Sequence, residues 1–284
     1  NKKVAQQVIK SGTEALPYIQ KFSKKICIVK YGGAAMIEES LKNSFARDIT
    51  LMKQVGINVA VVHGGGPQID KELEKSNIKR NFIDGIRVTD KETIEIVSNT
   101  LDEIINKEIV DLINKNGGNS IGVAKDKKGT ISVEKLTSEN TDYGYVGEVV
   151  NVNSNYLYEL MNSNYIPVIA PLGYDSSGQI YNINADTAAS QIASHLSAEK
   201  LIFLTDTQGV NDDKGNLIST LNSKEIKHFI ESDIIRGGML PKINASLEAV
   251  SKSVKTAHII DGRIQHSVLL EIFTNDGIGT LVKK

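Results

Sequence analysis

The chain has 284 residues, which is enough for one large domain or for two lobes around a sizeable buried core. Hydrophobic residues make up 40% and charged residues 24%, as in an average globular protein, and this composition excludes a disordered chain. The formal net charge of -1 provides no overall field for a nucleic-acid backbone. We therefore expect no nucleic-acid partner, and any anionic ligand must be bound locally.

A single cysteine, Cys27, excludes an internal disulfide and a cysteine-built zinc site. No apolar run reaches the roughly 18 to 20 residues that a bilayer requires, so no membrane partner is expected. Both observations fit a reducing, cytoplasmic location. The sequence starts at Asn1 rather than at a Met, and it leaves open whether an organelle-targeting segment precedes it.

Apolar residues recur at helical spacing from Val4 to Ile19 and predict an N-terminal amphipathic helix that ends at the break of residues 23–25. Periodicity alone favours a helix packed on its own body. The first strand is expected directly after this break.

One pattern then occurs twice: a continuous apolar strand, a glycine turn and a helix. Residues 26–31 stop at Gly32-Gly33 before a helix from about Ser40 to Gln54, and residues 58–63 stop at Gly64-Gly65-Gly66 before a helix opened by Pro67. Continuous apolar strands separated by helices are typical of a parallel sheet covered on both faces. We expect an α/β fold with a mainly parallel central sheet sandwiched between helices. Further strands fit residues 165–170, 200–205 and 256–261, and further helices fit residues 186–196 and 243–251.

Three turns that combine Asp with Gly predict β-hairpins, which should decorate the sheet rather than build it. They are residues 126–129, 175–178 and 213–215. Pro171-Leu172-Gly173 follows an apolar strand and is the expected boundary between two lobes. The predicted parts are an N-terminal helix at 1–22, an N-terminal lobe at 23–172 and a C-terminal lobe at 173–284.

Several familiar motifs fail in context. Residues 118–122 match the serine-hydrolase pattern G-x-S-x-G, but a helix ends there and a strand follows, whereas that nucleophile requires a strand-to-helix turn. Glycines that cap a helix C-terminus explain the match better. The glycines at 64–66 lack the third glycine of G-x-G-x-x-G, which disfavours hydride transfer. Neither a G-x-x-x-x-G-K-[ST] loop nor the H-R-D and D-F-G motifs of protein kinases are present.

An anion site is nevertheless indicated. Glycine turns at the carboxyl ends of parallel strands place bare N–H groups and helix N-termini at one edge of a sheet, although each turn alone is as readily an ordinary tight turn. Lys30 stands near the end of an apolar strand, and Lys242 stands at a predicted loop-to-helix junction. Either lysine alone is more often a solvated charge. Residues 182–186 open a helix, and on local sequence alone their Asn and Asp are caps.

Taken in order, these motifs resemble the amino-acid kinase family over nearly the whole chain. The glycine motifs alone would also suit kinases of aspartate, glutamate, carbamate or nucleoside monophosphates. The combination of Gly-Ile-Arg-Val-Thr at 85–89 with Asn-Ile-Asn-Ala-Asp at 182–186 is similar to the members that act on N-acetyl-L-glutamate. The other segments that carry the resemblance are residues 28–33, 62–66 and 237–242.

The resemblance implies transfer of the γ-phosphoryl group of MgATP to the side-chain carboxylate of N-acetyl-L-glutamate, a step of arginine biosynthesis. It implies that Lys30 and Lys242 flank the migrating phosphoryl group and that Asp186 holds both lysines. Phosphoryl transfer asks mainly for positioning and positive charge, and a carboxylate nucleophile is already ionised at neutral pH, so no general base is needed. Mg²⁺ is expected on ATP oxygens and water, without protein ligands.

The resemblance also implies binding residues. Gly33, Gly64 and Gly65 would present N–H groups to the phosphoryl oxygens. Arg87 would bind the substrate's α-carboxylate through its planar fork, and Gly65 and Asn182 would help to orient the substrate. The N-terminal lobe would hold this site and the dimer contacts, and the C-terminal lobe the ATP and effector sites. The expected nucleotide-binding residues are Thr205, Asp206, Gly209 and Gly238.

A regulatory layer is implied as well. Residues 1–22 precede the lysine strand, where short family members begin, and residues 271–280 resemble the C-terminal pattern of arginine-inhibited members. In those proteins the extra helix interlaces with a neighbour's and joins dimers into a hexameric ring. The resemblance therefore implies a homohexamer, a trimer of dimers, that is inhibited by L-arginine. The expected effector-binding residues are Tyr18, His258, Glu271 and Gly277.

Two alternatives stay open. One is another kinase of the family, which acts on free glutamate or aspartate. The other is a non-catalytic arginine sensor that retains the fold, and the presence of Lys30, Lys242 and Asp186 argues against it.

Overall fold

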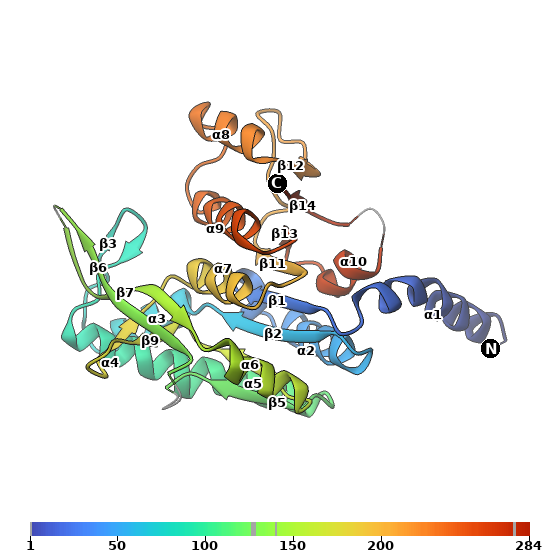
Figure 1. The fold of residues 1–284 in the computed structure, drawn as a ribbon, viewed down its shortest axis with the longest axis horizontal. Coiled ribbons are helices and arrows are strands. Elements are labelled where there is room, and N and C mark those ends of the chain that lie inside the picture. The colour runs from blue at the N-terminus through green and yellow to red at the C-terminus, as the bar shows by residue number, and fades with distance from the viewer. Residues whose placement is uncertain (1, 126–128, 140, 275–276) are drawn as a thin grey trace.

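The computed structural model describes residues 2–125, 129–139, 141–274 and 277–284, and within these ranges the central sheet has eight strands in the order β12-β14-β13-β11-β1-β2-β8-β5 (Figure 1). All neighbouring strands are parallel except β13 and β14. The mainly parallel sheet is thus confirmed. The strands are β1 (Ile26–Tyr31), β2 (Asn58–His63), β5 (Ser120–Val123), β8 (Ile166–Ile169), β11 (Lys200–Thr205), β12 (Thr220–Leu221), β13 (Thr256–Asp261) and β14 (Thr280–Val282).

Helices cover both faces of this sheet. Successive residues of β1 point to opposite faces, so Ile28 is buried in one hydrophobic core and Val29 in the other. A strand buried on both faces is apolar throughout, which is the signal that the sequence carried. On the Ile28 face lie α6 (Ser154–Asn162), α7 (Ala185–His195), α8 (Ser223–Glu231) and α9 (Met239–Lys252). On the Val29 face lie α2 (Glu39–Gln54), α3 (Gly66–Lys75), α4 (Lys91–Asn99), the π-helix η2 (Thr100–Asn106), α5 (Lys107–Lys115) and α10 (Ser267–Phe273).

A closed four-stranded barrel stands beside the sheet within the described residues. Its turn at 175–178 joins two antiparallel strands and is a hairpin, as expected, and the Asp175 carboxylate accepts the N–H groups of Ser177 and Gln179. The predicted lobe boundary at residue 172 falls inside this barrel. Strand β9 pairs with β6 and β10 pairs with β7, so both strands belong to the barrel, and the division into two lobes stays a prediction. The barrel strands are β6 (Ile131–Ser138), β7 (Thr141–Val152), β9 (Leu172–Tyr174) and β10 (Ile180–Asn182).

The other predicted turns have mixed outcomes. In the turn at 213–215 the bonding carboxylate belongs to Asp212, which accepts the N–H groups of Lys214 and Asn216, so Asp213 was the wrong residue. The turn at 126–129 lies largely outside the described residues. At the serine-hydrolase-like segment α5 ends at Lys115 and β5 begins at Ser120, which confirms that no strand-to-helix elbow exists there.

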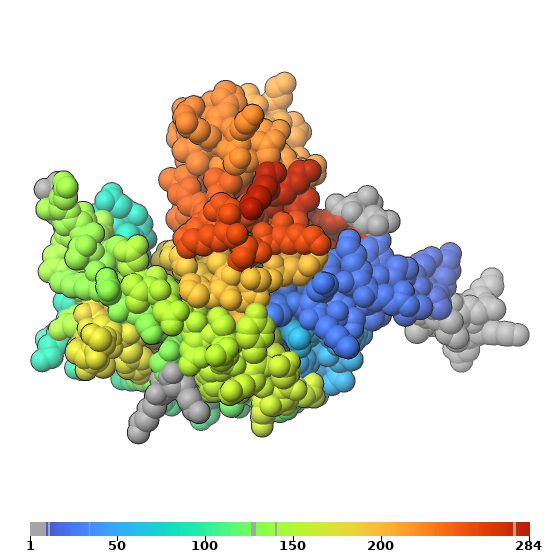
Figure 2. Space-filling view, in the orientation of Figure 1, coloured from blue at the N-terminus to red at the C-terminus, as the bar shows by residue number. Residues whose placement is uncertain are grey.

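The N-terminal helix α1 (Lys2–Phe22) runs outward from the body beside α10 (Figure 1). Among its described side chains the buried one is at the C-terminal end, since Phe22 is buried whereas Leu16 is 49% exposed. The expectation of a helix packed along its own body is therefore wrong for most of its described side chains. Figure 2 shows α1 protruding in blue and the C-terminal residues rising in orange and red. Across the described part of the chain, no helix has the length and apolar character to cross a membrane.

Candidate active site

Two lysines converge on one carboxylate at the carboxyl edge of the sheet. Lys30 Nζ at the end of β1 lies 3.0 Å from Asp186 Oδ1, and Lys242 Nζ donates a hydrogen bond of 2.9 Å to Asp186 Oδ2. Lys30 and Asp186 are 8% and 6% exposed, so both are buried. Lys242 lies inside the first turn of α9, not before the helix as predicted, because a helix tolerates Pro241 in its first turn, where N–H groups lack intrahelical partners.

Helix capping by Asn184 positions the Asp186 carboxylate. Asn184 Oδ1 accepts the N–H groups of Asp186 and Thr187 at 2.9 and 3.1 Å, so capping is the role of Asn184. Burial raises the pKa of the Asp186 carboxyl, but Lys30 and Lys242 outweigh burial and hold that pKa below its ordinary value. An ionised Asp186 between two ammonium groups leaves a net charge of +1, which suits an anionic ligand.

Asp186 is also the carboxylate that could bind a metal ion in this site. Both oxygens of Asp186 face lysines, which leaves it unsuited to bind a divalent cation directly. In the described ranges no group of three or more His, Cys, Asp or Glu residues could hold a metal ion.

The glycine turns form the wall of a cavity of about 200 Å³ that Lys30 and Asp186 also line. Gly33 has φ +68°, and a Cβ there would overlap the carboxylate of Asp206. A Cβ on Gly32 would lie 2.8 Å from Lys30 Nζ, and one on Gly65 would overlap Ile105. Gly33 therefore needs glycine for its backbone conformation, and all three positions bring the main chain close to neighbouring side chains and to any ligand in the cavity. The cavity is lined by Lys30, Gly32, Gly33, Met36, Gly64, Gly65, Gly66, Pro67, Gln68, Asn184, Ala185 and Asp186.

One predicted phosphate donor is already engaged. The N–H of Gly64 donates to the carbonyl of Tyr31 at 2.8 Å, a backbone link between the ends of β2 and β1. The prediction that Gly64 presents its N–H to a phosphoryl group is thus not supported in this conformation. The N–H of Gly65 donates to no backbone carbonyl in the described part of the chain, and it stays available at the start of α3.

A second cavity of about 170 Å³ adjoins the first and shares Gly64–Gly66, Asn184 and Ala185 with it. Arg87 and Asn182 both line it, as expected for a substrate site. Arg87 is 8% exposed, and its Nη2 pairs with Asp70 Oδ1 at 2.5 Å. Its buried Nη1 has no hydrogen-bond partner among the residues that the structure describes. A buried unsatisfied donor is costly, so a ligand carboxylate would be stabilised there.

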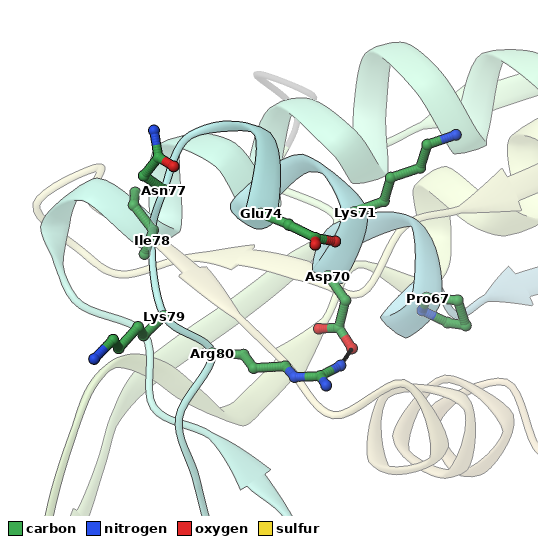
Figure 3. A pocket seen from close by; sticks show the side chains of 8 residues that line it. All are labelled: Pro67, Asp70, Lys71, Glu74, Asn77, Ile78, Lys79 and Arg80. Atoms are coloured by element: carbon green, nitrogen blue, oxygen red, sulfur yellow. Dashed lines mark hydrogen bonds and ion pairs between the residues drawn. The ribbon is translucent and has the colours of Figure 1, made fainter.

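A larger hollow of about 810 Å³ lies along α3 and residues 77–80 (Figure 3). Two of its charged groups pair with each other: Asp70 Oδ2 binds Arg80 Nη1 at 3.2 Å, and these side chains point toward each other in Figure 3. Asp70 thus bridges an exposed Arg80 and the buried Arg87. The size of this hollow does not make it the reactive site, because neither Lys30 nor Lys242 lines it.

The residues predicted to bind nucleotide surround the same sheet edge. Thr205 ends β11, the strand next to β1, and Asp206 follows it against Gly33. Gly238 is the N-cap of α9, the helix that carries Lys242. For Gly209 packing explains the glycine, because a Cβ would lie 2.7 Å from both Leu217 and Thr280. Their contact with a nucleotide stays a prediction.

A separate cavity of about 570 Å³ brings together the four residues predicted to bind an effector. Glu271 Oε1 pairs with His258 Nδ1 at 2.6 Å, and Glu271 Oε2 accepts the N–H of Ile278 at 3.0 Å. Burial raises the pKa of Glu271, but His258 and other donors outweigh it and hold this pKa below its ordinary value. Tyr18 and Gly277 complete the set, and their role in binding stays a prediction.

Sequence reasoning missed two polar groups. Lys200 at the start of β11 lies 3.0 Å from His258 Nε2 and lines the effector cavity. Its signal was a lysine at the edge of an apolar strand, the same signal that marked Lys30. His63 is fully buried at the end of β2, and a histidine inside an apolar run gives no periodic signal.

Acid should destabilise the protein through His63. Burial lowers its pKa from 6.5 to about 4, so the unfolded chain binds this proton first as the pH falls. This contribution is intact above pH 6.5 and is lost toward pH 4, by up to about 1.4 kcal/mol per pH unit. Denaturant unfolding at pH 7, 6 and 5 measures it, with His63→Asn as the comparison. Burial raises the pKa of Asp48 to about 6, so this carboxyl group stabilises the folded protein as the pH falls. Its effect is the same in wild type and in His63→Asn, and it cancels when the two are compared. Parallel pH curves would contradict the prediction.

Comparisons with known proteins agree with the family resemblance that the sequence motifs indicated. A sequence model described as "Amino acid kinase family" matches residues 25–261. The acetylglutamate kinase of Campylobacter curvus is 52% identical over 280 residues, covering 99% of this chain and 98% of that protein. The acetylglutamate kinase of Aquifex aeolicus is 49% identical over 281 residues, or 94% of each. N-acetylglutamate synthase from Neisseria gonorrhoeae, complexed with coenzyme A and N-acetyl-glutamate, superimposes with a TM-score of 0.86 at 23% identity, over 97% of this chain and 63% of that one. The last similarity concerns the fold alone.

Proposed function

Because the chain belongs to the amino acid kinase family, we propose that it transfers the γ-phosphoryl group of MgATP to the side-chain carboxylate of N-acetyl-L-glutamate, giving N-acetylglutamyl 5-phosphate. The observation that carries the proposal is the convergence of Lys30 and Lys242 on Asp186, next to two adjoining cavities. Relatives about half identical over nearly the full chain and named acetylglutamate kinase support the substrate.

The two cavities suggest how the reactants meet. The substrate's α-carboxylate binds Arg87 in the smaller cavity, and the phosphoryl group enters the cavity beside the lysines. Their shared wall, Gly64–Gly66, is where the side-chain carboxylate reaches phosphorus. Lys30 and Lys242 stabilise the charge on the transferring oxygens, and Asp186 fixes both ammonium groups. Mg²⁺ on the nucleotide neutralises further phosphate charge.

The lining of the smaller cavity favours an acylated amino acid over free glutamate or aspartate. None of its described lining residues is acidic, and Ile69, Phe82, Leu101 and Val146 contribute apolar surface. A free α-ammonium group would lose hydration there without gaining a partner. A neutral amide with an apolar methyl group costs much less to desolvate than a charged ammonium group.

Trapping of the acyl phosphate with hydroxylamine tests the proposal. With MgATP we expect hydroxamate from N-acetyl-L-glutamate and at least tenfold less from L-glutamate or L-aspartate. A preference for a free amino acid would identify a different kinase of the family. No hydroxamate from any acceptor would favour a non-catalytic sensor.

We further propose that L-arginine binds in the 570 Å³ cavity and inhibits the enzyme. The ionised Glu271, buried beside Gly277, offers a carboxylate to the effector's cationic end. We expect Glu271→Gln to raise the half-inhibitory arginine concentration at least tenfold without changing the uninhibited rate. The control is Glu231→Gln on the exposed end of α8. Equal arginine response in both variants, or no inhibition of the wild type at millimolar arginine, would refute the proposal.

We propose a hexamer, a trimer of dimers joined by α1. The outward course of this helix and its exposed Leu16 support a role in association. Deletion of residues 1–16 should give dimers by light scattering. This deletion retains Tyr18 in the effector cavity and the buried Phe22, so it separates assembly from effector binding. A hexamer that survives the deletion would argue against this role of α1.

A further inference from the structure

A buried chain of hydrogen bonds leads to the glycine turn at the end of β2. Asn106 Nδ2 donates to the carbonyl of Val168 in β8 at 2.9 Å and lies 3.1 Å from His63 Nε2. His63 Nδ1 lies 2.9 Å from the carbonyl oxygen of Gly64. His63 and Asn106 are 0% and 3% exposed, so water does not compete for these groups.

The hydrogen-bond partners determine which atoms of Asn106 and His63 donate and which accept. The Val168 carbonyl can only accept, so the amide nitrogen of Asn106 faces it and directs its second N–H to His63 Nε2. His63 Nε2 must then accept, and the proton of the neutral ring resides on Nδ1. His63 therefore donates from Nδ1 to the Gly64 carbonyl. Among the described residues the charged neighbour of the His63 ring is the ammonium group of Lys30. Its positive charge disfavours a second proton on the ring.

The receiving carbonyl belongs to a peptide that faces the phosphate cavity. Because a trans peptide is planar, the carbonyl of Gly64 and the N–H of Gly65 belong to one rigid unit and point in opposite directions. Glycine on both sides leaves this unit free to rotate unless something holds it. The hydrogen bond from His63 holds it, and so sets the direction of the Gly65 N–H, whose residue lines both cavities.

Neighbouring residues pack closely around these hydrogen-bonded side chains. Asn106 is the last residue of the π-helix η2, and such helices frequently occur at functional sites. A Cβ at Gly122 would overlap Asn106 Oδ1, so the last glycine of the serine-hydrolase-like segment makes room for this amide. Leu101 and Ile105 of η2 pack against Gly65 itself.

We propose that His63 and Asn106 are positioning residues that hold the Gly64–Gly65 peptide, so that the Gly65 N–H is aimed at the transferring phosphoryl group. The proposal rests on the kinase function proposed above. Loss of an oxyanion donor lowers kcat by roughly 10²- to 10³-fold, and a donor that is misdirected rather than deleted should cost roughly 10- to 100-fold.

Replacement of His63 separates aiming from packing. His63→Leu fills the site but donates nothing, whereas the amide nitrogen of His63→Asn can occupy the place of Nδ1. We expect His63→Leu to lower kcat roughly 10- to 100-fold with the KM for N-acetyl-L-glutamate within threefold, and His63→Asn to recover most of the loss. His228→Leu, on the exposed face of α8, is the control. Equal activities of His63→Leu and wild type, or equal losses in Leu and Asn variants of matched melting temperature, would overturn the proposal.

An isosteric change at Asn106 tests the proton assignment and covers the case in which His63→Leu does not fold. In Asn106→Asp the carboxylate accepts from His63 Nε2, which leaves no proton on Nδ1 until the ring takes a second one. We expect kcat of this variant to be low at pH 8 and to recover relative to wild type as the pH falls to 6. A constant ratio of the two rates across this range would refute the assignment. A wild type that makes no hydroxamate would instead refute the kinase proposal itself.

Discussion

Lys30→Met is expected to lower kcat by roughly 10²- to 10⁴-fold, because it removes a cation beside the transferring phosphoryl group and keeps most of the side-chain volume. The KM for N-acetyl-L-glutamate should change little, since Arg87, which we propose binds that substrate, lines the adjoining cavity. Hydroxamate formation at saturating substrates measures the effect.

The matched control is Lys115→Met, which removes the same charge from the exposed end of α5. It should leave kcat within twofold, because surface charges are screened by salt. A Lys30→Met enzyme with more than a third of wild-type kcat would show that the phosphoryl group is stabilised elsewhere.

Asp186→Asn should lower kcat by roughly 10²- to 10³-fold without weakening ATP binding. A neutral amide cannot hold two ammonium groups in place, so the lysines lose their positions for the transition state. The local charge rises from +1 to +2, however, and this favours the triphosphate in the ground state. Nucleotide titration and turnover should therefore move in different directions. A parallel loss of ATP affinity would contradict this role of Asp186.

The same substitution has a stability signature. Removing one partner of a buried ion pair costs about 3 to 5 kcal/mol, so the variant should be less stable than wild type at pH 7. The folded-state pKa of Asp186 lies below its ordinary value of 3.8, so this contribution is present above pH 3.8 and is lost as the pH falls through the lower, folded-state pKa. The stability difference should shrink only in that acidic window. A difference that is already lost at pH 5 would mean that Asp186 is not ionised as described.

Several features of the site could be predicted because they depend on residues that lie close together in the sequence. The strand, glycine turn and helix at 26–54 and at 58–75 follow from continuous apolar runs and from glycines, and both formed as expected. Asn184 was recognisable as a cap because capping involves residues within one helical turn. Lys242 was predicted to stand just before its helix, but α9 begins at Met239 and tolerates Pro241 in its first turn.

Other features required partners that the local sequence does not contain. The N–H of Gly64 is occupied by Tyr31, a residue of the neighbouring strand, and this changed which glycine is free to bind phosphate. Strands β9 and β10 join the barrel because they pair with β6 and β7, and the local sequence around Pro171 does not show this pairing. The role of His63 depends on Asn106 and Val168, which come from two other elements.

From the residues alone, periodicity and glycine content predicted the α/β class and the two glycine turns, because these signals lie within a few residues of one another. The grouping of Lys30, Lys242 and Asp186 was implied only by the family resemblance, since locally each lysine is typical of a solvated charge and Asp186 of a helix-cap residue. The tertiary structure decided which N–H groups stay free, which arginine nitrogen lacks a partner and which proton His63 carries. Those properties depend on burial and on hydrogen-bond partners many residues away, and such partners exist only once the sheet has assembled.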